Sequence, residues 1–176
     1  MNATPQVRVL SADDAQAFSN LRREVVAVDP VGLGLSQDEE LTRTLAGFQA
    51  QLAQPAPGAV FGAFINGELA ATAAVSRVNP FASSQHKMVM WGVFTSPRFR
   101  RLGLGRQLVG TALAHAAAAG VRRVNLLVYV PNAPALALYR SLGFEPTGTE
   151  PDAVRLDGRM YDGLHMTATC APPSES

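Results

Sequence analysis

The stretch that decides the fold reads Val93-Phe94-Thr95-Ser96-Pro97-Arg98-Phe99-Arg100-Arg101-Leu102-Gly103-Leu104-Gly105-Arg106. An apolar strand ends near Thr95, the chain turns, and glycines stand where a long helix begins. Backbone N–H groups in the first turn of a helix are unpaired and carry the positive end of its dipole. Glycines let an anion approach that backbone, and the arginines add positive charge. The stretch therefore predicts a cradle for a phosphate or pyrophosphate.

Other known phosphate-binding loops do not fit this stretch. The dinucleotide-binding pattern Gly-x-Gly-x-x-Gly would need a glycine where Leu108 stands. The nucleoside-triphosphate loop needs Gly-Lys followed by Ser or Thr, which the sequence does not contain. Short glycine motifs also match by chance. Gly103 and Gly105 by themselves are therefore also consistent with a tight turn flanked by solvated arginines that binds no phosphate.

Around this stretch, alternating and helical apolar patterns predict a mixed α/β fold. We expect strands over residues 7–10, 59–65, 68–77, 87–95 and 123–130, and a final hairpin that turns at Asp157-Gly158. We expect about four helices, over residues 12–28, 37–52, 103–119 and 133–142. This order contains one parallel crossover, made by the helix over 103–119. The sheet should therefore be largely antiparallel.

Local signals mark the ends of several elements. Ser11 with Asp14, and Ser36 with Glu39, have the spacing of helix capping boxes. The segment 30–35, which contains a proline and two glycines, should interrupt the helices between these caps. Asn66-Gly67 is a strong β-hairpin signal.

The composition indicates one globular domain and excludes several classes of protein. The 176 residues are 47% hydrophobic and 16% charged, with a net charge of +1. A net charge this close to zero gives no reason to expect binding to nucleic acid or to an anionic membrane. No apolar run is long enough to span a membrane. We expect a single domain over residues 1–169 and a disordered tail over residues 170–176.

The cysteine and histidine content argues against metal and disulfide sites. The only cysteine, Cys170, excludes an internal disulfide and a cysteine-based zinc site, and such usage is typical of the reducing cytoplasm. The three histidines are scattered along the sequence, so no metal site is expected. We expect a cytoplasmic protein in which Cys170, placed in the tail, is an implausible nucleophile.

Two motifs make the chain similar to a known family. Arg100-x-x-Gly103-x-Gly105, after a strand that ends Val93-x-Thr95-x-Pro97, resembles motif A of the GCN5-related N-acetyltransferases, the GNAT family. The box Asn132-x-x-Ala135-x-x-Leu138-Tyr139-x-x-x-Gly143-Phe144 resembles their motif B. Together with the element order, the resemblance covers nearly the whole chain. It implies a sheet that splays between strands 87–95 and 123–130, with acetyl-CoA as cosubstrate in the gap.

The resemblance also implies how acetyl-CoA is bound. Backbone groups of the strand residues Val93, Phe94 and Thr95 should pair with the pantetheine arm. The cradle should bind the pyrophosphate through backbone amides, with Arg101 and Arg106 as the direct positive charges. Its residues are Arg100, Arg101, Leu102, Gly103, Leu104, Gly105 and Arg106. Asn132 should cap the helix that follows it and can also meet the pantetheine.

Tyr139 is the expected general acid. The resemblance implies that its phenol lies near the acetyl sulfur and protonates the departing thiolate of CoA. An ordinary pKa of about 10 suits this task because the phenol keeps its proton at neutral pH. The alternative is an amphipathic tyrosine that anchors its helix over Leu138 and Leu142. The implied reaction is direct attack of an amine on the thioester, without an acetyl-enzyme and with backbone N–H groups near Val93 polarising the carbonyl.

The general base is not evident from the sequence. Protein-acetylating relatives carry a glutamate near the positions of Met88 or Leu127, and both residues are apolar here. Glu24, on the first helix, is a weak candidate base, and the alternative is a solvated partner of a nearby arginine. A chain of waters, or an amine that arrives neutral, would also suffice.

We expect the acceptor to be a small-molecule primary amine. Its wall should come from the first two helices, the segments 30–35 and 79–85, and the hairpin around Asp157. Asp29 and Asp162 could hold a cationic acceptor. The alternatives are acetylation of a protein N-terminus or lysine, and a module that binds acyl-CoA without catalysis. The sequence also leaves open a homodimer and a longer acyl donor.

Overall fold

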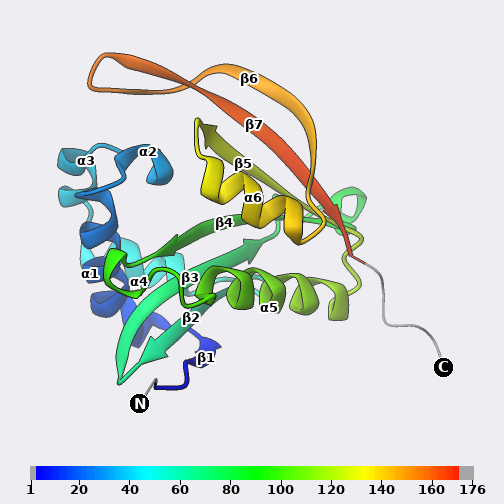
Figure 1. Cartoon of the computed structure of the whole chain (residues 1–176). Coiled ribbons are helices and arrows are strands. Elements are labelled where there is room, and N and C mark those ends of the chain that lie inside the picture. The colour runs from blue at the N-terminus through cyan, green and yellow to red at the C-terminus, as the bar shows by residue number, and fades with distance from the viewer. Residues whose placement is uncertain (1–2, 171–176) are drawn as a thin grey trace.

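The computed structural model describes residues 3–170 and contains one sheet of seven strands (Figure 1). The strands are β1 (Gln6–Val9), β2 (Ala59–Ile65), β3 (Glu68–Ser76), β4 (Lys87–Thr95), β5 (Arg123–Val130), β6 (Glu145–Leu156) and β7 (Arg159–Thr169). They are ordered β1-β2-β3-β4-β5-β7-β6. Every neighbouring pair is antiparallel except β4 and β5, which run parallel on either side of the crossover. The predicted mixed, largely antiparallel sheet is confirmed.

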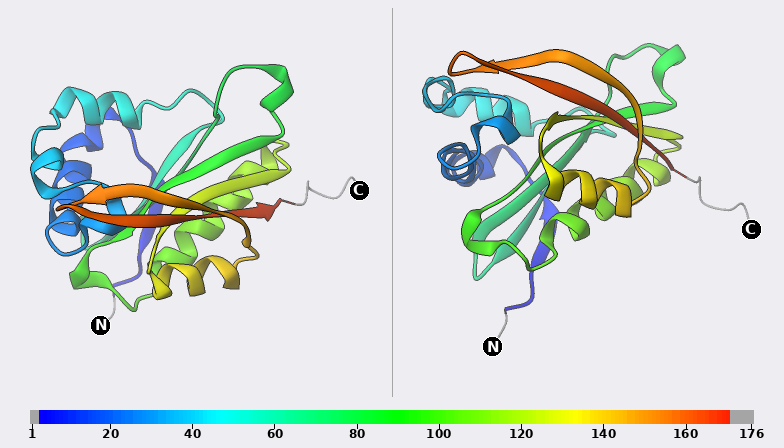
Figure 2. Two further views of the ribbon diagram at one scale, coloured as in Figure 1. Left: turned by 90° about the horizontal axis from the view of Figure 1, so that it is seen from above. Right: turned by 45° about the horizontal axis from the view of Figure 1, so that its top comes forward.

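Helices cover both faces of the sheet (Figure 2). One face carries α1 (Ala15–Val26), α2 (Pro30–Leu33), α3 (Gln37–Leu41) and α4 (Leu45–Leu52), and the other carries α5 (Leu104–Ala118) and α6 (Ala133–Ser141). Short 3₁₀ turns are η1 (Ala12–Asp14), η2 (Ala82–Ser84) and η3 (Pro97–Phe99). None of the described helices is long and apolar enough to cross a membrane.

The helices of the first third of the chain are divided more finely than predicted. The expected interruption over residues 30–35 contains α2, which Asp29 caps by accepting a hydrogen bond of 2.9 Å from the Gly32 amide. The helix expected over residues 37–52 forms as α3 and α4. It breaks because the Thr44 hydroxyl accepts a hydrogen bond from the Gly47 amide and so starts a new helix. Both predicted capping boxes are present.

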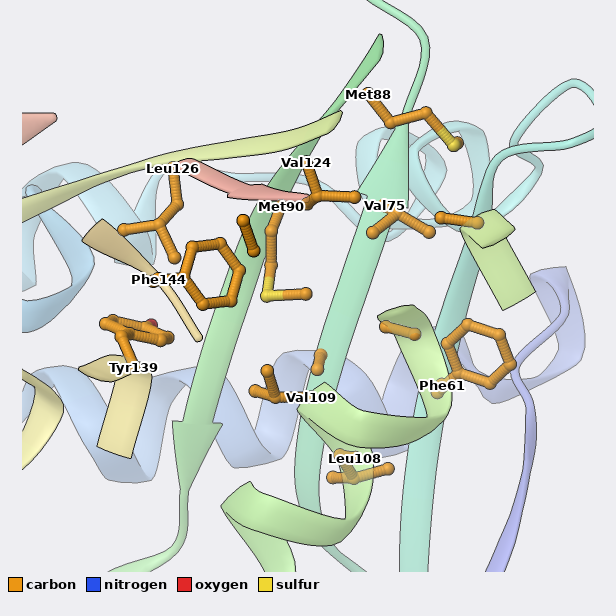
Figure 3. Close-up of a cluster of buried hydrophobic side chains, with 14 of the residues drawn as sticks. Phe61, Val75, Met88, Met90, Leu108, Val109, Val124, Leu126, Tyr139 and Phe144 are labelled. Atoms are coloured by element: carbon orange, nitrogen blue, oxygen red, sulfur yellow. The ribbon is translucent and has the colours of Figure 1, made fainter. Parts of the chain in front are cut away.

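Two apolar clusters hold the helices on the sheet, one on each face. On the α5 face, Phe61, Leu108, Val124 and Phe144 belong to one buried cluster that surrounds the crossover (Figure 3). On the α1 face, Phe18 packs edge-on against Phe48, with ring centroids 5.9 Å apart. Full burial of each such side chain stabilises the fold by about 1.5–3 kcal/mol.

The parallel pair β4 and β5 is hydrogen-bonded only at its first residues. Lys87 pairs with Arg123, Met88 with Val124 and Val89 with Asn125, and the described pairing ends there. Beyond this point each strand keeps only its outer neighbour, β3 for β4 and β7 for β5. The predicted splay is therefore present, and it starts after the third residue of β4.

A bulge in β4 lies inside the splayed region. Gly92 has a φ of 61°, and the register between β3 and β4 shifts between Thr72 and Ala74. Thr72 is a buried residue, 1% exposed, and its hydroxyl donates a hydrogen bond of 2.7 Å to the Gly92 carbonyl oxygen. A positive φ favours glycine, so sequence and hydrogen bond together fix the bulge at this position.

The end of the domain differs from the expectation in one residue. Cys170, which was expected to begin the tail, is 6% exposed and belongs to the core cluster on the α5 face. Its amide donates a hydrogen bond of 2.8 Å to the Arg122 carbonyl oxygen, which continues the contact of β7 with β5. The remainder of the predicted tail, residues 171–176, lies outside the described residues.

Candidate active site

A cavity of about 750 Å³ lies where β4 and β5 separate. Residues of both strands line it, together with Val25, Asp29, Gly32 and Leu33 on the α1–α2 side and the start of α5 and most of α6 on the other side. Because its lining comes from both faces of the sheet, the cavity passes between the two strands. Every predicted cofactor residue except Leu102 lines it, and the Leu102 side chain is 53% exposed.

The backbone before α5 has the shape of an anion cradle. Arg101 has a φ of 64° and Gly103 a φ of 74°. Successive amides in such alternating conformations converge on a concave site that favours anions. Gly103 is the N-cap of α5 and provides no side-chain hydrogen bond to the first turn. The first amides of this helix are therefore available to a ligand in the cavity.

Glycine is required at positions 103 and 105 of the cradle for different structural reasons. A β-carbon at Gly103 would have no atom within 4 Å, so the space next to it belongs to the cavity and the positive φ is what requires glycine. A β-carbon at Gly105 would lie 3.3 Å from the Leu138 side chain, so this glycine lets α6 pack closely on α5. Gly103 therefore bears on the ligand and Gly105 on helix packing.

All three arginines of the predicted cradle line the cavity, whereas Arg98, which precedes the cradle, does not. Arg100, Arg101 and Arg106 line the cavity, and Arg106 also donates a hydrogen bond of 2.7 Å from Nη2 to the Ser141 hydroxyl on α6. Arg98 turns away and forms ion pairs with Glu24 and Glu68. Three guanidinium groups thus remain at the cavity.

Tyr139 reaches the cavity from α6. Its side chain is in the core, with the residue 7% exposed, and its ring packs edge-on against Phe144 with centroids 5.6 Å apart (Figure 3). Burial raises the pKa of the phenol to about 12, because the phenolate would lose its hydration. Both roles considered for Tyr139 are compatible with this position, since the residue anchors α6 and also lines the cavity.

Asn132 precedes the same helix. Its side-chain Oδ1 accepts a hydrogen bond of 3.2 Å from the Ala135 amide, so the expected cap is present. The residue also lines the cavity, next to the end of β5.

The candidate base Glu24 does not reach this cavity. Its Oε1 accepts hydrogen bonds of 2.6 Å from the Ser96 hydroxyl and 3.0 Å from Arg98 Nε. The Arg98 hydrogen bond is the main cause of a pKa held below the usual range of this carboxyl. Glu24 lines a separate depression together with Glu68 and Arg98. The structure therefore matches the alternative interpretation, a carboxylate paired with an arginine, because the turn at Pro97 brings Arg98 to α1.

The acceptor wall differs from the expectation in its composition. Val25 of the first helix and Gly32 and Leu33 of the segment 30–35 line the cavity as expected. The second predicted helix over residues 37–52, the segment 79–85 and the hairpin around Asp157 do not. The sequence analysis missed Trp91 and Tyr129, which line it from β4 and β5. The period of two along each strand is the signal that could have found them, because alternate residues point to the α1 face.

Two of the three histidines make contacts outside the cavity. His115 makes a hydrogen bond of 2.7 Å with the Pro57 carbonyl oxygen and packs edge-on against Phe61. His165 pairs with Glu150 at 2.8 Å on the terminal hairpin. Within residues 3–170, no group of three or more His, Cys, Asp or Glu side chains is placed to hold a metal ion.

The chain is similar to a known protein family in sequence and to solved structures in fold. The sequence model of the acetyltransferase (GNAT) family matches residues 26–144. No curated protein matches the chain. Solved structures are similar over nearly its whole length. One is an acetyltransferase of the GNAT family from Streptococcus pneumoniae, with 22% identity and a TM-score of 0.84 over 94% of this chain and 99% of that one.

Two further solved structures with the same fold are of acetyltransferases whose names give different acceptors. A ribosomal-protein-alanine N-acetyltransferase from Brucella melitensis has 23% identity and a TM-score of 0.81, over 93% of this chain and 99% of that one. A phosphinothricin acetyltransferase from Sinorhizobium meliloti, in complex with acetyl-CoA, has 20% identity and a TM-score of 0.83, over 100% and 92%. At such identities the likeness shows the fold.

Proposed function

The chain belongs to the GNAT family of acetyltransferases, whose cosubstrate is acetyl-CoA, and from this premise we propose that it transfers the acetyl group to the primary amine of a small molecule. The observation that carries the proposal is the opened pair β4 and β5, whose cavity joins an anion cradle to a buried tyrosine. A cytoplasmic location is part of the same proposal, since Cys170 is a free thiol.

The residues present fit acetyl-CoA along the length of the cavity. The amides that follow Gly103, with Arg101 and Arg106 beside them, suit the pyrophosphate. The edge of β4 from Met90 onwards has no strand partner towards β5, so its backbone is free to pair with the pantetheine amides. Acetyl-CoA supplies an activated acetyl thioester, and the protein supplies its position.

The roles of the protein in the transfer follow from protonation states. Tyr139 holds its proton well above neutral pH, so its phenol can donate that proton to the thiolate sulfur as the carbon–sulfur bond breaks and the new carbon–nitrogen bond forms. The attacking amine gives up one proton as the carbon–nitrogen bond forms, and Tyr139 regains one proton from solvent, which restores the phenol. An acceptor that arrives as the ammonium ion first loses a further proton to solvent. Positioning of the amine against the thioester contributes the largest part of the rate.

The alternatives have less support from the residues. A module that binds acyl-CoA without catalysis would not need the Tyr139 hydroxyl in the cavity. Acetylation of a protein N-terminus or lysine would favour a carboxylate on β4 or β5. The cavity-lining positions of these strands carry none: Leu127 lines the cavity with an apolar side chain, and Met88 is an apolar residue buried outside it.

Thermal unfolding with and without acetyl-CoA tests the shared premise. A ligand that binds only the folded state at a hundred times its dissociation constant stabilises by about 2.7 kcal/mol. Release of free CoA thiol, measured over a panel of small amines, then identifies transfer. An unchanged melting temperature at millimolar acetyl-CoA would contradict the proposal.

A matched pair of variants locates the binding site. Gly103→Ala places a side chain on a backbone with a φ of 74° and should weaken acetyl-CoA binding measured by calorimetry. Gly110→Ala lies on the same helix, where a β-carbon also meets no atom within 4 Å, and should leave the affinity unchanged. Equal affinities of the two variants would argue against the cradle.

A further inference from the structure

The charges that line the cavity are separated between its two ends. Arg100, Arg101 and Arg106 all lie on the side of α5 and α6. On the side of α1 and α2, Asp29 is the one charged residue among the described residues that line the cavity. One end of the cavity therefore suits an anion and the other a cation.

The position of the Asp29 carboxylate is set by α2. Its Oδ1 accepts the hydrogen bond from the Gly32 amide, and a β-carbon at Gly32 would lie only 2.4 Å from its Oδ2. The carboxylate thus lies across Gly32, a place that it can take only because this residue has no side chain. The amide contact uses one acceptor site of Oδ1, so the second site of Oδ1 and both sites of Oδ2 remain for other donors. The group can therefore pair with a ligand cation while it caps α2.

Aromatic side chains line the same cavity as Asp29. Tyr129, on β5, packs so closely on α2 that a β-carbon at Gly34 would lie 2.5 Å from its ring. Trp91, on β4, is held in place by a hydrogen bond of 2.7 Å from its Nε1 to the Ser76 hydroxyl. Both residues line the cavity, as does Phe94. Aromatic faces attract organic cations and pack against apolar or aromatic bodies.

The arginine that lies over the Phe94 ring is already paired. The Arg22 guanidinium lies 5.5 Å from the centroid of the Phe94 ring, on α1. It makes a bidentate ion pair with Glu40, at 2.7 and 2.8 Å, and both residues are buried. Arg22 does not line the cavity, so it offers nothing to a carboxylate or phosphate on an acceptor.

We propose that the acceptor is a primary amine with an aromatic or apolar body and no carboxylate or phosphate, and that its cationic form is recognised by Asp29. This inference rests on the proposed acetyl transfer and adds the class of acceptor. An amino acid would bring a carboxylate to an end of the cavity that carries a like charge and no lining cation, and an unpaired charge is costly to desolvate. Asp29 is thus a specificity-determining residue.

Pairs of compounds that differ only by one carboxylate test the proposal. Tryptamine against tryptophan and phenethylamine against phenylalanine keep the ring and the amine constant. Thiol release should give a kcat/KM at least about tenfold higher for each amine than for its amino acid, the effect of about 1.4 kcal/mol. Equal or higher values for the amino acids would overturn the inference and leave acetyl transfer intact.

The variant Asp29→Asn tests the residue itself. Asparagine caps helices about as well as aspartate, so α2 keeps its cap while the charge is lost. We expect KM for tryptamine to rise about tenfold, because hydrogen bonds to charged groups are worth about that factor or more. The preference for amine over amino acid should narrow, and acetyl-CoA affinity should not change. Asp38→Asn, on the exposed surface of α3, is the matched control.

The outcomes separate this inference from the proposed function. An Asp29→Asn enzyme with the wild-type preference would overturn the assignment of Asp29. Binding of acetyl-CoA without acetylation of either amine would overturn the acceptor class. Absence of any acetyl-CoA binding would contradict the proposed function itself.

Discussion

Replacing Tyr139 by phenylalanine removes one hydroxyl and, with it, one proton equilibrium. The phenol has a pKa of about 12 in the folded protein against an ordinary value of 10.0, because burial penalises the phenolate. Above pH 10 the unfolded chain loses this proton while the folded protein keeps it, so the free energy of unfolding falls as pH rises. Each pKa unit corresponds to about 1.4 kcal/mol. The loss is therefore about 1.4 kcal/mol between pH 9 and pH 11, and about 2.7 kcal/mol once pH exceeds 12.

Urea unfolding of the wild type and of Tyr139→Phe at pH 9, 10 and 11 measures this difference. The chain suits the experiment because it contains three tyrosines and one lysine, so few other groups titrate in this range. The remaining groups, including the thiol of Cys170, whose pKa burial also raises, are common to both proteins and cancel in the comparison. Phenylalanine should flatten the pH dependence by about 1.4 kcal/mol over the two units. Identical slopes in the two proteins would refute the buried, protonated phenol.

The turnover of Tyr139→Phe and two further variants probe the site and its support. Tyr139→Phe should lower kcat about a hundredfold with little change in acetyl-CoA affinity, the size expected for loss of a general acid, while Tyr161→Phe on β7 serves as control and equal turnover would remove Tyr139 as the acid. Glu40→Gln should cost about 3–5 kcal/mol in urea unfolding, because it leaves the Arg22 charge buried and unpaired; a loss under 1 kcal/mol would contradict this. Glu24→Gln should leave turnover unchanged, and its free energy of unfolding should fall less than that of the wild type as the pH is lowered. The lowered pKa of Glu24 stabilises the wild-type fold above the ordinary carboxyl pKa, and this contribution disappears as pH falls. A large fall in kcat would restore Glu24 as a base.

The features that were predicted correctly have local causes. Asn66 and Gly67 adopt φ values of 51° and 80°, as the hairpin signal requires, and β2 and β3 follow from it. The cradle before α5 follows from a strand end, glycines and a helix start, all within fourteen neighbouring residues. Capping boxes, turn glycines and apolar periodicity act over a few residues, so they can be recognised without knowledge of the fold.

The features that were not predicted depend on distant residues. Glu24 lies beside Arg98 only because α1 packs next to the turn after β4, and that pairing removes it from the cavity. Cys170 is buried because β7 runs the full length of β5. The division of residues 37–52 into two helices depends on a single hydroxyl at Thr44, which competes with an otherwise continuous apolar pattern.

The chain's own residues establish the family, the sheet and the phosphate end of the cavity, because short motifs and local backbone preferences encode them. The acceptor end exists only in the folded protein. Asp29, Trp91 and Tyr129 come from three separate elements, and they line one cavity because β4 and β5 separate and α2 packs on Tyr129. The combination of a carboxylate and aromatic side chains in one cavity could not be predicted from the sequence, because the three residues are far apart along the chain and no local pattern connects them.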